Sequence, residues 1–388
     1  MALQIIRRDL HAHPELAFCE TRTADVVARE LSALGFETHR GLAQTGVVGV
    51  LRAGRSGRAI GLRADMDALP MNEANCFAHR SVFEGRMHAC GHDGHTAMLL
   101  GAARLLAASR DFDGTVYLIF QPAEESSGGA RVMIEEGLFE RFPMEAIYGM
   151  HNWPGLPAGD FAVHAGPVMA GTDRFDIRIL GVGGHAAMPH LVVDSIHAGA
   201  VLVQAVQSIV SRSLDPFDTA VVSVTRFHAG DAYNVLPDQA ELAGTLRSFS
   251  EDVRQKALTR LAELCAGISA TLGVKIDFSA RADSYPPTIN TAGEAARCVQ
   301  AAAAVVGREH VRTDVRPSMG AEDFACYLQH KPGAYIWIGN DPTGGEPGSH
   351  AGLHNPTYDF NDDILPLGAA YWVELVRHIL GRSVQGDG

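Results

Sequence analysis

The sequence predicts an α/β fold: a mostly parallel sheet with helices on both faces, with a separate α+β domain inserted into it. Strand-like and helix-like segments alternate up to about Gly171, and the same style resumes after about Tyr285. Between these points the order is β-α-β-β-α-β, which is the ferredoxin-like order. We therefore predict a discontinuous domain of residues 1–170 and 285–388, and an inserted domain of residues 171–284.

The first part of the chain supplies most of the predicted parallel sheet. Helices are expected at Leu3–Leu10, Thr23–Leu34, from Thr96 onward, and at Ala130–Glu136. Strands are expected at Gly46–Arg52, Ala59–Ala64, Gly114–Phe120 and Ala146–Met150. The third of these strands is a continuous apolar run, which is typical of a strand buried on both faces.

The pattern changes after Gly171, where Arg174–Leu180 alternates apolar and polar residues as a half-exposed strand does. The other predicted strands of the insertion are Thr219–Phe227, Ala240–Phe249 and Val274–Ala280, with helices at Asp194–Ser213 and Glu251–Leu272. The α/β style then returns with a helix at Ala292–Val306, a buried strand at Ala334–Gly339 and a closing helix at Pro366–Leu380.

The composition is that of an ordinary globular protein, with 46% hydrophobic and 20% charged residues. A formal net charge of −13 and a pI near 5.7 argue against nucleic acid and anionic membranes as partners. An anionic small-molecule substrate would therefore need a local cationic anchor.

The six cysteines are scattered without the spacing of a disulfide framework. The first residues contain no apolar run long enough for a signal peptide, and no stretch approaches the length of a membrane span. We therefore expect a cytoplasmic protein with reduced thiols.

The stretch Met87–His95 concentrates chemically reactive side chains within a few residues. Cys90 and His92 flank a glycine, so both can point at one atom, and the predicted helix follows directly. Taken alone, the stretch fits a buried thiol beside solvated histidines as well as it fits a metal site.

Three successive strands favour a metal site over a buried thiol, because polar residues lie at the end of each strand. Asp65 ends one strand, the doublet Glu124-Glu125 follows the next, and His151 follows the third. In such sheets, binding sites form at the carboxyl ends of the strands. Core histidines and solvated acidic pairs would not share this placement.

Imidazole, carboxylate and thiolate groups come together in a set of five ligands and one base: Cys90, His92, Glu124, Glu125, His151 and the later His354. Such a set suits zinc, manganese, cobalt or nickel. Five ligands are too many for one tetrahedral ion with an open position, but they fit two ions that share a bridging ligand. One glutamate of the doublet can then bind metal while the other acts as general base.

Eight motifs occur in order between about His11 and Phe360: GLRADMDALP, MHACGHDGHTAMLLGAA, FQPAEE, GMHNWP, GGHAAMPH, NVLPD, SMGAEDF and LHNPTYDF. Together they resemble the aminoacylase/hippurate hydrolase family. These enzymes are dinuclear, metallopeptidase-like amidohydrolases and include the plant indole-acetyl-amino-acid hydrolases. The resemblance is specific for the family and much less so for the substrate.

The resemblance implies roles for individual residues. It makes Cys90 the bridging metal ligand and Glu124 the general base. It makes His185 the residue that stabilises the oxyanion. The other implied ligands are His92, Glu125, His151 and His354, and the implied substrate contacts are Asn234 and Arg247.

One stretch departs from the pattern of more distant relatives, which have a His-x-Asp pair at the end of the corresponding strand. Arg63 stands where we expect that histidine, in Arg63-Ala-Asp65. His92 takes over the ligand role in this interpretation. From its position alone we infer that Asp65 orients a ligand imidazole from behind.

The implied reaction is hydrolysis of the amide bond of an N-acyl amino acid, such as hippurate, to a carboxylic acid and an amino acid. It would use metal-activated water and two divalent ions per chain, either manganese, zinc, cobalt or nickel.

The first domain would be catalytic and zinc-peptidase-like, and the insertion would be a lid and dimerisation domain. The resemblance further implies a homodimer, or a higher homo-oligomer, in which His185 reaches the partner's metals.

Two other functions remain open at this point. One is a metallo-dipeptidase or aminopeptidase, which would need an anionic pocket for a free α-amine. The other is a non-catalytic metal- or ligand-binding protein, which would be expected to have lost the base or a ligand. The preferred acyl group and amino acid, and the native metal, are not specified by the sequence.

Overall fold

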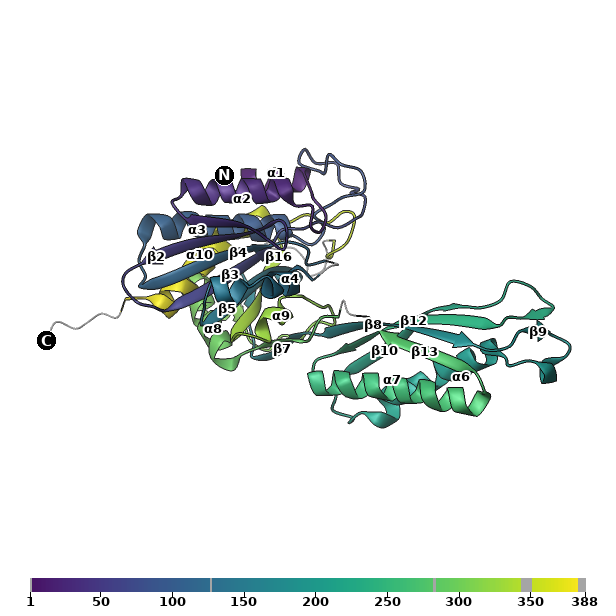
Figure 1. The fold of residues 1–388 in the computed structure, drawn as a ribbon. Helices are drawn as coiled ribbons and strands as arrows, with labels where there is room; N and C mark the ends of the chain where they lie inside the picture. Colours follow the sequence, from purple (N-terminus) through teal and green to yellow (C-terminus); the bar gives the residue numbers. More distant parts are fainter. Residues whose placement is uncertain (1, 126–127, 282–283, 343–350, 383–388) are drawn as a thin grey trace. The chain divides into compact units, whose positions relative to one another are not determined.

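The computed structural model describes residues 2–125, 128–281, 284–342 and 351–382 (Figure 1). The chain forms two compact units. The first unit comprises Met1–Val168, Ile289–Arg316 and Asp323–Gly388. The second unit comprises Met169–Thr288 and the short segment Pro317–Glu322.

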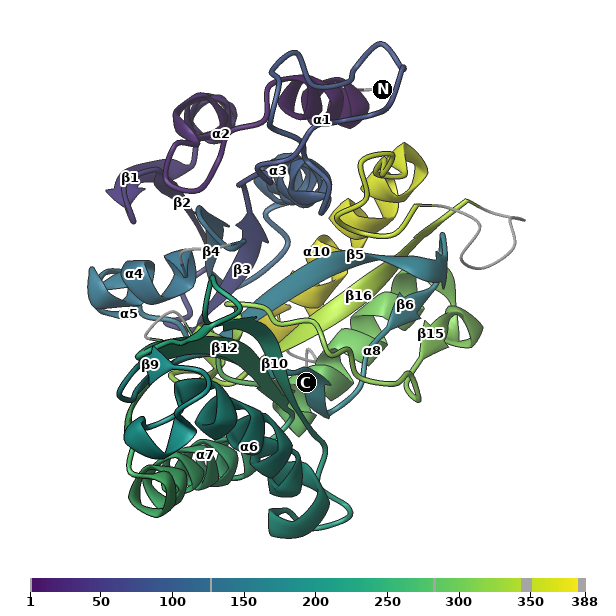
Figure 2. The ribbon, with the colours of Figure 1, turned by 90° about the vertical axis from the view of Figure 1, so that its right-hand side faces the viewer.

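The first unit is built on an eight-stranded sheet with the order β1-β2-β4-β3-β5-β16-β6-β15. Its central strands β4, β3, β5 and β16 are mutually parallel, whereas β1, β2 and β6 join neighbours in antiparallel orientation. Figure 2 shows β5 and β16 side by side. The bounds are β1 (Glu37–Leu42), β2 (Gly46–Ala53), β3 (Ala59–Asp65), β4 (Gly114–Gln121), β5 (Ala146–Pro157), β6 (Phe161–Ala162), β15 (Val311–Arg312) and β16 (Gly333–Asp341).

Helices cover both faces of this sheet, which confirms the predicted α/β architecture. The main core lies between one face and the helices α2 (Thr21–Ala33), α3 (His92–Ser109), α8 (Ala292–Val306) and α10 (Leu365–Leu380), with α1 (Ala2–Ala12) against α3. The other face carries α4 (Gly129–Glu135), α5 (Leu138–Arg141) and α9 (Ala325–Leu328). There Met133 of α4 lies against Gly46 and accepts a hydrogen bond from Tyr327 of α9.

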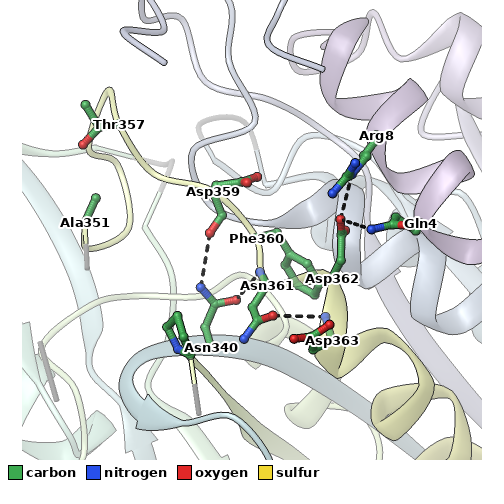
Figure 3. A pocket seen from close by; sticks show the side chains of 11 residues that line it. Gln4, Arg8, Asn340, Ala351, Thr357, Asp359, Phe360, Asn361, Asp362 and Asp363 are labelled. Atoms are coloured by element: carbon green, nitrogen blue, oxygen red, sulfur yellow. Dashed lines mark hydrogen bonds and ion pairs between the residues drawn. The ribbon is translucent and has the colours of Figure 1, made fainter. Parts of the chain in front are cut away.

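The segment that follows His354 is fixed to α1 and to β16. Arg7 is fully buried and donates to Asp362 over 2.6 Å, and Arg8 donates to the same carboxylate over 2.8 Å. Asn340 of β16 accepts a hydrogen bond from the backbone N–H of Asn361 over 3.0 Å. A cavity of about 380 Å³ is lined in part by Arg8, Asn340 and Asp362 (Figure 3). The network holds the loop on which His354 lies.

The second unit has a four-stranded antiparallel sheet with the order β10-β12-β8-β13, and its apolar side chains pack against two helices. This β-α-β-β-α-β arrangement is the predicted ferredoxin-like one. The bounds are β8 (Gly171–Leu180), α6 (Ser195–Ser208), β10 (Ala220–His228), β12 (Gln239–Ser248), α7 (Glu251–Leu272) and β13 (Lys275–Ala280). A π-helical turn, η2 (Ile209–Ser213), extends α6.

Small elements complete the described chain. A two-stranded ladder joins β9 (Gly184–His185) to β11 (Val235–Leu236), and another joins β7 (Gly166–Met169) to β14 (Thr288–Asn290). The 3-10 helices are η1 (Pro189–Leu191), η3 (Arg308–His310) and η4 (Asp362–Ile364). Within the described ranges, the helices are all too short or too polar to cross a bilayer.

Among the element boundaries that differ from the sequence prediction, two affect the candidate site. Helix α3 begins at His92 instead of near Thr96, because Gly91 adopts φ 95° as the residue that precedes the helix. Strand β5 continues past Met150 because it pairs with β16 as far as Trp153 and beyond. His151 therefore lies inside a rigid strand.

Candidate metal centre

All five side chains expected to bind metal lie together in the first unit. Cys90 Sγ is 3.4 Å from His151 Nε2 and 3.3 Å from His354 Nε2. Glu125 Oε1 is 3.3 Å from His354 Nε2 and 3.8 Å from His92 Nε2. These contacts join residues from strand β5, the segment that follows β4, the start of α3 with the turn before it, and a distant loop.

Two groups of side chains that both contain Cys90 together include all five residues, and the ligand atoms within each group lie within 4.8 Å of one another. One group is Cys90, His92 and His151, and the other is Cys90, Glu125 and His354. Cys90 belongs to both. A thiolate shared by two groups is the arrangement that two ions with one bridging ligand require.

Local geometry explains how Cys90 and His92 come to face the strands. Gly91 between them has φ 95°, and a Cβ there would lie 2.2 Å from Asn152 Oδ1. Only glycine satisfies both the left-handed backbone and this close approach. His92 then occupies the first turn of α3, with its Nε2 3.7 Å from Asp65 Oδ2 at the end of β3 and its ring centroid 6.1 Å from that of His151 in β5.

Unpaired atoms in the cluster fit a bound cation. His92 Nε2 and Glu125 Oε1 are buried and make no hydrogen bond with any residue that the structure describes. Burial and the nearby Glu125 and Glu124 carboxylates hold the pKa of the Cys90 thiol well above its usual range, so an anionic sulfur here needs a positive charge beside it. The nitrogen, oxygen and sulfur donors therefore fit borderline divalent metals.

Asp67 orients two of the predicted ligands. Its Oδ1 is 3.2 Å from His92 Nδ1, and its Oδ2 accepts a hydrogen bond from the Glu125 N–H over 3.0 Å. Burial alone would lower the pKa of His92, but Asp65 and Asp67 together raise it to about 10. A carboxylate behind a ligand imidazole fixes the ring and leaves the other nitrogen for the metal.

Asp65, which the sequence suggested for that orienting position, contacts a different imidazole. Its Oδ1 is 2.6 Å from His95 Nδ1, while its Oδ2 pairs with Arg63 over 2.6 Å and lies 3.7 Å from His92 Nε2. His95 in turn contacts Asn152 Oδ1 over 2.8 Å. Asp65 therefore supports the cluster through His95, and the orienting contact to His92 Nδ1 comes from Asp67.

His151 is held in the tautomer that leaves Nε2 available. Its Nδ1 lies 2.6 Å from the Asn152 carbonyl oxygen, which can only accept, so Nδ1 carries the proton. Burial and the adjacent His95 hold the pKa of His151 well below its usual range. The ring is thus neutral, with Nε2 directed at Cys90.

Glu124 is buried beside the cluster, and its carboxylate lies within 4.8 Å of ligand atoms of both His92 and Glu125. Its Oε1 accepts a hydrogen bond from the Asp323 N–H over 3.3 Å. The residue before it, Ala123, has φ 59°, and this turn directs the two carboxylates of the doublet differently. The buried Glu20 fixes the turn by accepting a hydrogen bond from the Ala123 N–H over 2.9 Å.

Sequence reasoning missed Glu20, Asp67, Asn152 and Asp323. Only Asp67 gave a usable signal, because it follows Asp65 by two residues at the end of the same strand. Arg63 contributes a buried positive charge by pairing with both Asp65 and Asp323, the latter over 2.9 Å. It therefore balances part of the negative charge around the cluster.

The remaining predicted site residues belong to the second unit. His185 lies on β9 and is exposed, and its Nδ1 accepts a hydrogen bond from the Ala187 N–H over 3.1 Å. In the neutral ring its Nε2 therefore carries the proton. Asn234 is exposed beside β9, where its backbone carbonyl accepts a hydrogen bond from the Ala186 N–H over 3.1 Å. Arg247 is half-buried on β12, where burial and the like charge of Arg174 lower its pKa.

The chain matches the model of the peptidase family M20/M25/M40 over residues 61–378. It is 40% identical to a hippurate hydrolase of Campylobacter jejuni, over 97% of this chain and 96% of that one. It is 39% identical to an N-acetylcysteine deacetylase of Bacillus subtilis, with 97% and 96% covered.

A solved structure from Bacillus subtilis, a dinuclear metal binding peptidase from the M20 family, superposes with a TM-score of 0.85 at 35% identity. The match covers 98% of this chain and 97% of that one. Sequence and structure agree over almost the whole length, and the chain belongs to the peptidase family M20/M25/M40.

Proposed function

We propose that this protein is a metal-dependent amidohydrolase that cleaves the amide bond of N-acyl amino acids. The observation that carries the proposal is the pair of ligand groups that share Cys90, with the buried carboxylate of Glu124 beside them. The hippurate hydrolase and the N-acetylcysteine deacetylase, both near 40% identity over almost the full chain, support this substrate class.

We propose that two divalent ions bind per chain. Cys90 would be the ligand that the two ions share, and the other ligands would be His92, His151, Glu125 and His354. When bound, such ions lower the pKa of a water molecule and stabilise negative charge on a carbonyl oxygen. The donor set suits manganese, zinc, cobalt or nickel. Asp67 and Asn152 keep the ligand imidazoles oriented.

The side chains of the protein then manage the proton and the substrate. Glu124 accepts the proton of the attacking water as its oxygen bonds to the acyl carbon, and delivers it to the nitrogen as the C–N bond breaks. His185 offers its Nε2–H to the oxyanion. Arg247 pairs with the substrate carboxylate, and Asn234 adds a polar contact. The products are a carboxylic acid and a free amino acid.

An assay of substrate classes separates this proposal from its rivals. The metal-loaded protein should hydrolyse hippurate or N-acetylmethionine, lose activity with a chelator and regain it with manganese. A dipeptidase or aminopeptidase would prefer substrates with a free α-amine. A non-catalytic metal- or ligand-binding protein would cleave neither class, and either result would overturn the proposal.

We further propose that the chain forms a homodimer through its second unit, with higher homo-oligomers built from that dimer. β10 is an outer strand of the four-stranded sheet, and its Val221 and Phe227 are exposed. An outer strand with exposed apolar side chains favours pairing with another chain.

We also propose a cytoplasmic location, since all six cysteines are free and two of them, Cys19 and Cys76, are exposed.

A mixed dimer tests whether His185 acts at the partner's metal centre. Glu124→Gln and His185→Ala chains should each be inactive alone. After subunit exchange, the site with intact Glu124 would receive an intact His185 from the other chain, so we expect activity to return toward a quarter to a half of the wild-type level, following roughly the fraction of competent sites. If heterodimers form, as seen by mass spectrometry, and the mixture stays inactive, His185 acts within its own chain.

A further inference from the structure

Two tryptophans form a stacked pair on the sheet next to the metal cluster. Trp153 of β5 and Trp337 of β16 have ring centroids 3.9 Å apart and planes within 9° of parallel. Trp337 is opposite His151 in the parallel register. Since side chains two residues apart in a strand point to the same face, Trp153 shares the face of the sheet that carries the His151 imidazole.

The pair lies within reach of a substrate held at the cluster. The Trp153 ring centroid is 6.1 Å from that of His151, whose Nε2 is 3.4 Å from Cys90 Sγ. A carbonyl positioned at these ligands has its acyl substituent one side chain away from the indole. An aromatic ring attached to the carbonyl directly, or through one methylene, has the length to meet Trp153.

Two features distinguish the pair from ordinary core packing. Trp153 is only half-buried, so part of its ring remains open to a ligand. Trp337 is 3% exposed, and within the described ranges its buried indole N–H has no hydrogen-bond partner. Buried indole N–H groups normally find an acceptor, and a missing one indicates that water or a ligand supplies it.

We propose that the Trp153–Trp337 pair is the acyl-binding platform of this protein and that it selects flat aromatic acyl groups over acetyl. This inference rests on the proposed amidohydrolase function. Stacked or edge-to-face aromatic pairs add about 0.5–1.5 kcal/mol beyond the area they bury. An acetyl group has no π face, so its binding gains none of this aromatic free energy. Trp337 fixes the plane of Trp153, and Trp153 meets the acyl ring.

The test compares N-benzoylglycine with N-acetylglycine, which differ only in the acyl group. Wild-type protein should prefer the benzoyl substrate in kcat/KM. Trp153→Ala should reduce this preference by roughly 2- to 12-fold, which is the equivalent in kcat/KM of the aromatic contribution. Trp153→Leu keeps an apolar side chain without a π face, so it should also reduce the preference for the benzoyl substrate. Trp153→Phe keeps an aromatic ring and should retain most of that preference. Trp372→Phe, in the buried core of α10, is the matched control and should keep the wild-type ratio.

A binding measurement separates this inference from the proposed function. N-benzoylglycine should quench tryptophan fluorescence of the metal-loaded Glu124→Gln variant, and the added Trp153→Phe substitution should remove most of the quenching. If both substrates are cleaved and Trp153→Ala lowers both rates equally, the platform is wrong and the function stands. If neither is cleaved but Trp153-dependent quenching is seen, the function is wrong and the platform stands. Absence of quenching by N-benzoylglycine also overturns the platform.

Discussion

Glu124→Gln is expected to lower kcat by roughly 10²–10⁴-fold while the protein keeps its metal. Glutamine preserves the shape of the side chain, and its carbonyl oxygen can still accept the hydrogen bond from the Asp323 N–H. It cannot take a proton from water at neutral pH. The loss should therefore appear in kcat, with little change in KM, and metal content should be measured on the same sample by elemental analysis.

Glu125→Gln is the matched control, because it changes the neighbouring residue in the same way. Glu125 Oε1 lies among the ligand atoms, 3.3 Å from His354 Nε2, so this variant should bind metal more weakly. Near-normal turnover of Glu124→Gln, or metal loss from it, would show that the two glutamates have been assigned to the wrong roles.

Cys90→Ala is expected to remove both metal and activity. Cys90 is the member common to both ligand groups, so its loss weakens both at once. The fall in metal affinity should exceed the 10–100-fold typical when a supporting partner of a ligand is removed. Equilibrium dialysis against buffered manganese or zinc measures it.

Cys265→Ala serves as the control for removing a buried thiol, since Cys265 is 3% exposed and packs in the core of the second unit. It should leave metal binding at the wild-type level. If Cys90→Ala binds two ions with unchanged affinity, the sulfur does not bridge them.

The sequence predicted the arrangement of layers because its signals are local and repeated. The apolar run of β4 and the alternation in β8 report burial directly, and the order of elements then restricts the topology. β1 was missed because Glu37–Leu42 is a polar, largely exposed edge strand, and its pairing with β2 has no signature in its own residues.

The ligand set could be predicted because each member lies at a strand end or in a distinctive motif. The supporting contacts could not, since they join residues that are remote in sequence. Nothing near Glu20 shows that its carboxylate accepts from Ala123, 103 residues away. Likewise, the choice between Asp65 and Asp67 as the partner of His92 depends on where α3 begins, which the left-handed Gly91 decides.

The measurement that tests the central claim most directly is the number of metal ions bound at saturation. Protein stripped with chelator, reloaded with manganese or zinc and freed of excess metal should contain two ions per chain by elemental analysis. Activity should rise with occupancy and reach its maximum only as the second ion binds. Saturation at one ion per chain with full activity would contradict a dinuclear centre built on Cys90.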